Sequence, residues 1–263
     1  MIVVSLTSIP SRLKLLWNFF NSIQKQTLQP DVIYVQIPKV SRKGIPYDLE
    51  ILGKTVKMFN KLNIKINVLP IDYGPITKLY PLFDLVEDPN ASLILMDDDV
   101  QYSNNTIETL VKNGNLEACG FVGLIKKDDK LVWRHKGTVS FLETYHGVLY
   151  KRHLFPKNSN KFINWYLQKI KEEPICANTD DIIIGAWVHK KGYKLNIIED
   201  SNVKVVHNPG GTEELRNTNL KDGNMICYNY IFAVDNKYYY DFIILGLVLI
   251  MVGMIIYLRK VFF

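Results

Sequence analysis

Short runs of apolar, often β-branched residues alternate along the first half of the chain with segments whose apolar residues recur every three or four positions. The runs predict β-strands, and the spaced segments predict amphipathic helices. This alternation is typical of βαβ units around a mostly parallel sheet flanked by helices, which is an α/β fold. The expected strands are residues 2–6, 32–37, 64–69, 92–96 and 121–124, and the expected helices are residues 12–25, 49–62 and 77–86.

The second half of the chain has a more mixed pattern, with no internal repeat or low-complexity linker. We therefore expect a single domain over residues 1–225. In its second half the expected elements are loops and short strands at 133–149, helices at 162–170 and 181–190, and a strand at 203–206.

The C-terminal region is apolar on every helical face. Residues 242–258 contain no charged side chain, and Arg259 and Lys260 follow directly. A helix of this length spans roughly 25 Å, and flanking aromatic residues extend it towards the roughly 30 Å of a bilayer core. The pattern predicts a juxtamembrane segment at 226–241, a transmembrane helix at 242–258 and a short tail at 259–263; the alternative is a buried core helix.

The orientation of such an anchor follows from the two ends of the chain. No signal peptide precedes the first strand, so a late C-terminal helix is expected to leave the preceding domain facing the cytosol. Arg259 and Lys260 favour the opposite orientation by the positive-inside tendency. We expect a single-pass membrane protein whose main domain faces the cytosol.

The composition limits the classes of molecule that the protein is expected to bind. The chain has 263 residues, is 48% hydrophobic, and carries a net charge of +6, which suits anionic partners such as nucleotide phosphates. No basic block of five or six residues is present, so nucleic acid is not an expected partner. Cys119, Cys176 and Cys227 are odd in number and widely spaced, which argues against a disulfide framework or a zinc site and indicates reducing surroundings.

Three consecutive carboxylates, Asp97, Asp98 and Asp99, follow the expected strand at 92–96. Three like charges at the end of a strand are costly unless a cation is nearby. In extended geometry Asp97 and Asp99 point the same way, so both carboxylates could ligate a single Mg²⁺ or Mn²⁺ ion. Such ions commonly bridge a protein to phosphate groups. Asp98 is then the member expected to tolerate replacement. The alternative is a solvated acidic turn after a core strand.

A second candidate segment runs from Asp72 to Lys78. Parallel strands place ligand sites at their carboxyl ends, where this segment, residues 5–10 and the acidic triplet are expected to meet. The segment is a Gly-Pro turn leading into a helix, whose free N–H groups and lysine suit a phosphate or a ribose hydroxyl. The alternative is an ordinary turn with a solvated lysine.

Two further candidates lie downstream. Asp180 and Asp181 open a helix, where they either meet the helix dipole or deprotonate a hydroxyl of a substrate. His207 follows a strand and precedes a Gly-rich turn. It is either a structural histidine or a third protein ligand to an ion held by Asp99.

In this order the motifs resemble those of the GT-A glycosyltransferases, over residues 1–225. The resemblance implies a Rossmann-like half that binds a nucleotide-sugar donor, with Mn²⁺ or Mg²⁺ on its diphosphate. The segment 142–150 is similar to the one that lines the sugar and acceptor site in that family. The implied metal ligands are Asp97, Asp99 and His207, the implied bases are Asp181 or Asp180, and the implied donor-binding residues are Thr7, Arg12, Asp72, Lys78, Asp97 and Asp98.

The resemblance implies transfer of the sugar, with inversion, to a hydroxyl of a glycan, glycoprotein or glycolipid, including lipid-linked acceptors. The chain departs from the common inverting members at residues 35–39, which lack the acidic residue that holds the nucleobase; Asp72 is expected to replace it. One alternative is a nucleotidyltransferase, although residues 7–10 lack the Gly-rich loop that such enzymes more often show. The other is a membrane-anchored nucleotide-sugar-binding protein without turnover, although no expected metal or base residue is missing.

Overall fold

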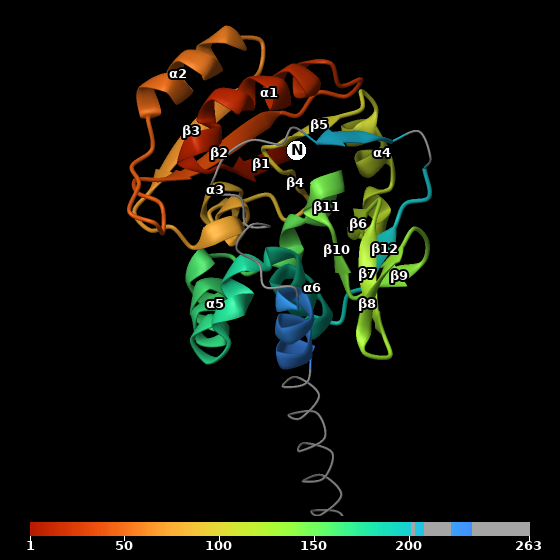
Figure 1. Ribbon diagram of the computed structural model, residues 1–263. Helices are drawn as coiled ribbons and strands as arrows, with labels where there is room; N and C mark the ends of the chain where they lie inside the picture. The colour runs from red at the N-terminus through yellow and green to blue at the C-terminus, as the bar shows by residue number, and fades with distance from the viewer. Residues whose placement is uncertain (201–202, 208–221, 233–263) are drawn as a thin grey trace, which may run out of the picture.

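The structure is a computed structural model that describes residues 1–200, 203–207 and 222–232. Within these residues, an eight-stranded sheet in the order β3-β2-β1-β4-β11-β6-β12-β9 runs through the middle of the domain (Figure 1). Its strands are β1 (Ile2–Thr7), β2 (Val32–Pro38), β3 (Ile64–Leu69), β4 (Ser92–Leu95), β6 (Ala118–Gly120), β9 (Thr138–Val139), β11 (Val148–Lys151) and β12 (Leu195–Ile197).

Two smaller sheets and the helices complete the described part of the fold. One small sheet has the order β10-β7-β8 and the other pairs β13 with β5. These strands are β5 (Val100–Tyr102), β7 (Gly123–Lys127), β8 (Lys130–Arg134), β10 (Phe141–Leu142) and β13 (Val205–His207). The α-helices are α1 (Leu16–Gln24), α2 (Leu49–Met58), α3 (Leu82–Leu85), α4 (Thr106–Lys112), α5 (Ser159–Glu172) and α6 (Asp180–Lys190), and residues 223–232 are also helical. The 3₁₀ helices are η1 (Pro10–Leu15), η2 (Gly74–Lys78), η3 (Gly114–Leu116), η4 (Thr144–His146), η5 (Arg152–Leu154) and η6 (Pro174–Asn178).

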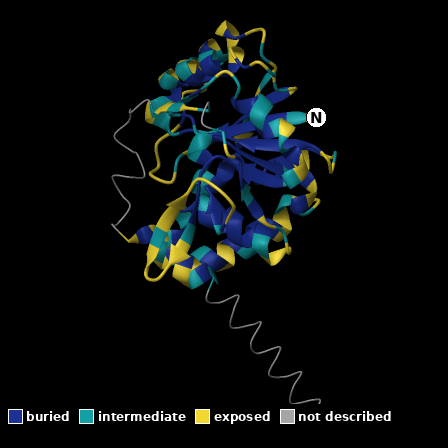
Figure 2. Ribbon diagram, turned by 90° about the vertical axis from the view of Figure 1, so that its right-hand side faces the viewer, coloured by how far each residue is buried: buried dark blue, intermediate teal, exposed yellow. Residues whose placement is uncertain are grey.

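The sheet separates two apolar cores because successive side chains of a strand point to opposite faces. On β1, Val3 packs with α3, α5 and α6, whereas Val4 and Leu6 pack with α1, α2 and α4. With helices on both faces, the central strands are buried almost throughout (Figure 2). This double burial explains why these strands are continuous apolar runs in the sequence.

The first four strands confirm the predicted parallel βαβ pattern, since β1, β2, β3 and β4 all run parallel. Farther along, β11 runs antiparallel to both of its neighbours, so the second half of the sheet is mixed. The strand predicted at 121–124 is confirmed only at Gly123 and Leu124, which begin β7. Phe121 and Val122 are buried, but they lie where the chain leaves β6 for the small sheet that contains β7. The helix predicted at 77–86 is interrupted before Pro81, which lacks an N–H for a helix interior.

Helix α6 lies unusually close to β10 because Gly185 has no side chain. A Cβ atom at Gly185 would lie 2.6 Å from Ser140 O and 2.7 Å from Phe141 Cβ, closer than real Cβ contacts allow. Seven of the residues after Asp181 on this helix are buried, so α6 is a core helix. Its packing carries the first turn of α6, with Asp180 and Asp181, to the segment that follows β10.

No helix within residues 1–200, 203–207 and 222–232 is both long and apolar enough to cross a membrane. The segment 242–258, on which we expected the anchor, lies outside the described residues. The prediction of a single-pass membrane protein with a cytosol-facing domain is corrected accordingly. What the structure describes is an α/β domain without a membrane-spanning helix.

Cys176 and Cys227 form a disulfide, with their Cα atoms 5.1 Å apart. The expectation of unpaired cysteines in reducing surroundings is therefore wrong, because disulfides persist mainly in oxidising compartments. The two cysteines are 51 residues apart in the sequence, and they meet because the helix at 223–232 packs against η6. Cys119 is a buried free thiol.

Removing the disulfide is expected to lower the free energy of unfolding by about 2–4 kcal/mol, because the bond closes a long loop in the unfolded chain. The test is urea denaturation of wild type and of Cys176→Ser/Cys227→Ser. Cys119→Ser serves as the control for removing a thiol without removing the bond. Equal stability of wild type with and without a reductant would contradict this expectation.

Candidate active site

A cavity of about 500 Å³ opens at the carboxyl ends of β1 and β4. The chain runs from β1 outward through β2 and β3 and then returns to β4 on the other side of β1, so strand order reverses at this point. Such switch points are where α/β sheets bind ligands. Each sequence-predicted site residue lines the cavity: Thr7, Arg12, Asp72, Lys78, Asp97, Asp98, Asp99, Asp180, Asp181 and His207.

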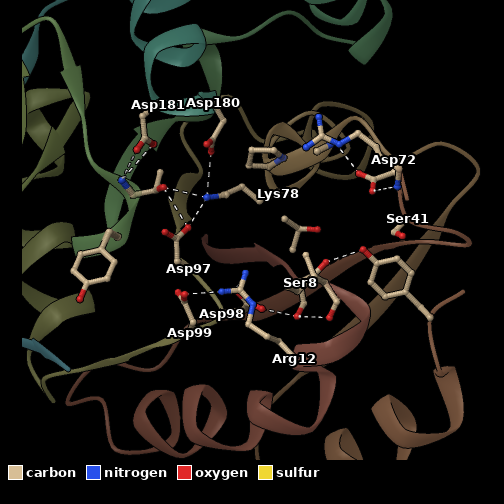
Figure 3. Close-up of a pocket in the computed structure, with 18 of the residues that line it drawn as sticks. Ser8, Arg12, Ser41, Asp72, Lys78, Asp97, Asp98, Asp99, Asp180 and Asp181 are labelled. Atoms are coloured by element: carbon tan, nitrogen blue, oxygen red, sulfur yellow. Dashed lines mark hydrogen bonds and ion pairs between the residues drawn. The ribbon is translucent and has the colours of Figure 1, made fainter. Parts of the chain in front are cut away.

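Lys78 is buried at the centre of the site, between two carboxylates (Figure 3). Its Nζ lies 2.5 Å from Asp97 Oδ1 and 3.1 Å from Asp180 Oδ2, and it donates to Thr144 Oγ1 at 3.0 Å. Burial alone would lower the pKa of Lys78, but Asp180 and Asp97 outweigh burial and raise it. The same ammonium holds the pKa of Asp97 below its ordinary value despite burial. Lys78 is therefore a fixed cation and not a solvated lysine.

Arg12, at the start of the segment after β1, binds the other two members of the acidic triplet. Its Nη1 lies 2.5 Å from Asp99 Oδ2, and its Nη2 lies 3.0 Å from Asp98 Oδ1. Ser8 Oγ donates to Asp98 Oδ2 at 2.5 Å, and His207 Nε2 lies 3.1 Å from Asp99 Oδ2. Burial raises the pKa of Asp98 to about 6, despite the ion pair with Arg12.

We expected Asp97 and Asp99 to ligate one metal ion together, and this arrangement corrects that expectation. Strand β4 ends at Leu95, and the triplet forms a turn before β5, in which Asp97 N donates to the Tyr102 hydroxyl at 2.9 Å. Asp97 faces Lys78, whereas Asp99 faces Arg12 and His207. The expectation for Asp98 is also wrong, since this residue is only 4% exposed and is bound on both oxygens.

Asp72 holds the loop that follows β2 against the turn before η2. Its Oδ2 accepts from Arg42 N at 2.9 Å and its Oδ1 accepts from Gly74 N at 2.7 Å. The Arg42 guanidinium reaches across to Ala177 O at 3.2 Å and Asn178 Oδ1 at 2.8 Å. Gly74 has a φ of +75°, and a Cβ there would lie 2.7 Å from that guanidinium. Asp72 thus orders the mouth of the cavity around a position that requires glycine.

Asp180 and Asp181 enter the cavity from the first turn of α6. Asp180 is buried against Lys78, whereas Asp181 is partly exposed and accepts from Thr144 N, at 3.3 Å to Oδ1 and 3.4 Å to Oδ2. Burial raises the pKa of Asp180, and burial together with the charges of Asp180 and Glu143 raises the pKa of Asp181 well above its ordinary value. Asp181 is thus a carboxylate with raised basicity that reaches the cavity.

Of the three expected metal ligands, Asp99 and His207 lie next to each other, whereas Asp97 faces Lys78. Asp99 Oδ2 and His207 Nε2 are 3.1 Å apart, close to the roughly 3.0 Å between adjacent ligands of an octahedral ion with bonds of about 2.1 Å. Within the described residues no group of three His, Cys, Asp or Glu side chains is arranged to hold a metal ion. Mg²⁺ and similar ions usually take one or two carboxylates and complete their shell with substrate phosphates and water, so a pair of protein ligands fits such an ion.

Comparison with solved structures bears on the fold. The structure is similar to GalNAc-T7, crystallised with UDP, GalNAc and Mn²⁺, with a TM-score of 0.56 over 89% of this chain and 11% identity. The chain has the GT-A fold. At this identity the likeness describes the fold and not the substrate, and this chain spans 48% of the length of that protein. The resemblance expected from the motifs is confirmed at the level of the fold.

Among the other similar structures are two with TM-scores below 0.5. S. aureus TarS has a TM-score of 0.48 and 14% identity over 77% of this chain and 36% of its own. A putative glucose-1-phosphate thymidylyltransferase from Bacillus anthracis has a TM-score of 0.45 and 12% identity over 87% of this chain and 94% of its own. No protein-family model and no curated protein sequence matches the chain.

Among the residues at this site, Ser8, Glu143 and Thr144 were expected only as members of the segments 5–10 and 142–150, and Arg42 and Tyr47 were not expected. Ser8 and Tyr47 order the loop after β1, since Ser8 O accepts from the Tyr47 hydroxyl at 2.8 Å. Arg42 and Thr144 make the contacts described above, and the charge of the half-buried Glu143 contributes to the raised pKa of Asp181. The available signal for Glu143 was weak: it is an isolated acidic residue in the otherwise uncharged stretch 137–150.

Replacing Lys78 with methionine is expected to lower the free energy of unfolding by about 3–5 kcal/mol, because Asp97 and Asp180 would remain buried without their cation. Lys43→Met is a matched control, since Lys43 lines the same cavity but is exposed. Its expected effect is within about 0.5 kcal/mol. Both variants are measured by urea denaturation at pH 7, and an equal effect of the two would disprove the structural role of Lys78.

Proposed function

We propose that the protein is a glycosyltransferase that uses a divalent metal ion to move a sugar from a nucleotide-sugar donor to a hydroxyl acceptor, with inversion. One observation carries the proposal: a single cavity at the β1–β4 switch point combines fixed cations with a basic carboxylate. In Figure 3, Lys78 lies between Asp180 and Asp181 on one side and the Arg12 cluster on the other. The acceptor fits a glycan or a lipid-linked sugar, since it needs only a hydroxyl group.

The charge of the cavity supports a metal ion. Among the described residues that line it, six are aspartates and four are lysines or arginines, and Lys78 and Arg12 are already paired. A diphosphate brings further negative charge, so its binding is unfavourable until another cation enters. Asp99 and His207 would hold that ion. When bound, Mn²⁺ or Mg²⁺ neutralises charge that develops on the departing nucleoside diphosphate.

Asp181 acts as the general base in this proposal. The oxygen of the acceptor hydroxyl attacks the anomeric carbon while its proton passes to Asp181, and the bond from that carbon to the diphosphate oxygen breaks. Thr144 N contacts both Asp181 oxygens and fixes the carboxylate. Asp180 is less suited to this role because its carboxylate is buried against Lys78. Asp180 and Asp97 instead hold Lys78 in place as a cation for the leaving phosphate.

The test is a release assay on the full chain with a panel of nucleotide sugars, with Mn²⁺, with Mg²⁺ and with a chelator. Metal-dependent release of a nucleoside diphosphate from at least one donor is the expected result. Metal-dependent binding without release would support the nucleotide-sugar-binding protein instead. Release of pyrophosphate from a nucleoside triphosphate and a sugar phosphate would support the nucleotidyltransferase. No turnover and no metal-dependent binding with any donor would refute the proposal.

A further inference from the structure

A tight turn at the mouth of the cavity presents two adjacent cations, Arg42 and Lys43. The turn lies in the connection between β2 and α2, and both of its cations line the cavity. It is closed by a hydrogen bond from Gly44 N to Ser41 O at 2.8 Å. Arg42 N also donates to Asp72 Oδ2 at 2.9 Å, which anchors the turn to the segment before η2. The backbone thus holds both cations at the cavity.

Neither cation forms an ion pair with a carboxylate of the described residues. Among these residues the Arg42 guanidinium donates to two neutral oxygens, Ala177 O at 3.2 Å and Asn178 Oδ1 at 2.8 Å. The Lys43 side chain is exposed. Hydrogen bonds from a guanidinium to a charged acceptor are roughly twice as strong as bonds to a neutral one, and its planar fork matches a phosphate or a carboxylate. An anionic group would therefore bind better here than the present partners.

The charges of the cavity are divided between its two sides. Lys78 and Arg12 are each paired with two carboxylates. In Figure 3, Asp97 and Asp181 lie on one side of Lys78, whereas Asp72 lies on the other, next to the turn. Asp72 offsets only one of the two positive charges of the turn. The side with the acidic triplet thus favours a cation, and the side with the turn favours an anion.

The turn is separated from the proposed diphosphate site by the length of η2. The Arg42 guanidinium lies against Gly74, the first residue of η2, where a Cβ atom would lie 2.7 Å from Arg42 Cζ. Lys78 is the last residue of η2, and five residues of a 3₁₀ helix extend roughly 8 Å. A diphosphate held by Lys78 and an ion at Asp99 lies at the far end of this helix. The anion at the turn therefore belongs to another part of the substrates.

The turn is close to the proposed base through η6. Asn178, which accepts from Arg42, is three residues before Asp181, so their Cα atoms are at most roughly 11 Å apart. The reacting hydroxyl of the acceptor must reach Asp181. A charged substituent on the same sugar or on its neighbour then lies near Arg42. The nucleoside of the donor carries no charge beyond the diphosphate, so the acceptor is the substrate that brings this group.

We propose that Arg42 and Lys43 bind a phosphate or carboxylate group of the acceptor, and that the acceptor is an anionic sugar. The anion-binding turn stands on the geometry, whereas its assignment to the acceptor rests on the proposed function. The Arg42 fork donates to the anion in place of Ala177 O and Asn178 Oδ1, and Lys43 adds a second positive charge beside it. The pair takes no part in bond breaking and selects the acceptor.

The anion preference is tested by equilibrium binding of three matched probes to the full chain, with and without a nucleoside diphosphate and Mn²⁺. The probes are nitrophenyl glucoside, its 6-phosphate and nitrophenyl glucuronide. The phosphate or the glucuronide is expected to bind at least about tenfold more tightly than the neutral glucoside, and the tighter of the two identifies the group. The difference is expected to shrink at high salt. Equal binding of all three probes would disprove the proposal.

Two variants assign the preference to the turn. Arg42→Met is expected to lower the anion preference about tenfold, and Lys43→Met about three- to fivefold, with binding of the neutral probe unchanged. Because Arg42 also holds Asn178, Lys43→Met is the variant that keeps the contacts of η6 intact. Lys39→Met is the matched control, since Lys39 is an exposed cation before the same turn that does not line the cavity. An unchanged preference in both Arg42→Met and Lys43→Met would overturn the proposal.

Kinetics with any donor that the release assay identifies separate this proposal from the proposed function. Lys43→Met is expected to raise KM for an anionic acceptor about three- to fivefold and to leave kcat and donor affinity unchanged. If Arg42→Met and Lys43→Met instead weaken binding of the nucleoside diphosphate, the turn binds the donor and its assignment to the acceptor is wrong. If the anionic probes bind preferentially through the turn but no donor is turned over, the anion site stands and the proposed function fails.

Discussion

Asp181→Asn is expected to lower kcat by about 10²- to 10⁴-fold and to leave donor affinity unchanged within about twofold. The range is the usual contribution of a general base. Asparagine keeps the shape of the side chain and an oxygen for Thr144 N, so the loss is confined to proton acceptance. Steady-state kinetics of sugar transfer and calorimetric titration with a nucleoside diphosphate measure the two quantities.

The matched control for this substitution is Asp129→Asn, which removes an exposed aspartate on the β7–β8 hairpin. It is expected to leave both kcat and affinity unchanged. If Asp181→Asn retains more than a tenth of the wild-type kcat, Asp181 is not the base. Asp180→Asn would then be compared next, because Asp180 is the other carboxylate that α6 brings to the cavity.

Asp99→Asn is expected to abolish metal-dependent donor binding and therefore turnover as well. Losing a partner of a metal ligand costs about 10- to 100-fold in affinity, so losing a ligand itself should cost at least that much. Calorimetric titration of a nucleoside diphosphate with and without Mn²⁺ separates this effect from metal-independent binding. Asp181→Asn should keep the Mn²⁺ enhancement, which distinguishes the two halves of the site.

Arg12 Nη1 contacts the same Asp99 oxygen that lies next to His207. A second variant is therefore needed that changes the proposed metal site without breaking this ion pair. His207→Ala removes the second proposed ligand and leaves the Arg12–Asp99 ion pair in place. We expect it to weaken the Mn²⁺ enhancement as Asp99→Asn does. Full enhancement in both variants would show that the ion, if used, is held elsewhere.

The strands that form one side of the site were predictable because each is buried on both faces. Residues 93–96 are an unbroken apolar run, and the sheet-edge rule then predicted that the segment 72–78, with Lys78, lies beside Asp97. The prediction failed at residues 121–122, where an equally apolar run crosses between two sheets. Apolar character predicts burial there, but it does not predict which sheet the chain follows.

The division of the acidic triplet was not predictable from the sequence. Each carboxylate takes its direction from a partner far along the chain: Lys78 is 19 residues from Asp97, and Arg12 is 87 residues from Asp99. Spacing within the triplet carries no information about such partners.

The helix at 223–232 has a consequence for any shortened version of the protein. It runs through the domain boundary expected at residue 225, and its Cys227 and Ile231 are fully buried in the same core as α5 and α6. A fragment ending at 225 would leave Cys176 unpaired and open that core directly beneath η6, which leads into Asp180. Expression fragments should therefore extend beyond residue 232.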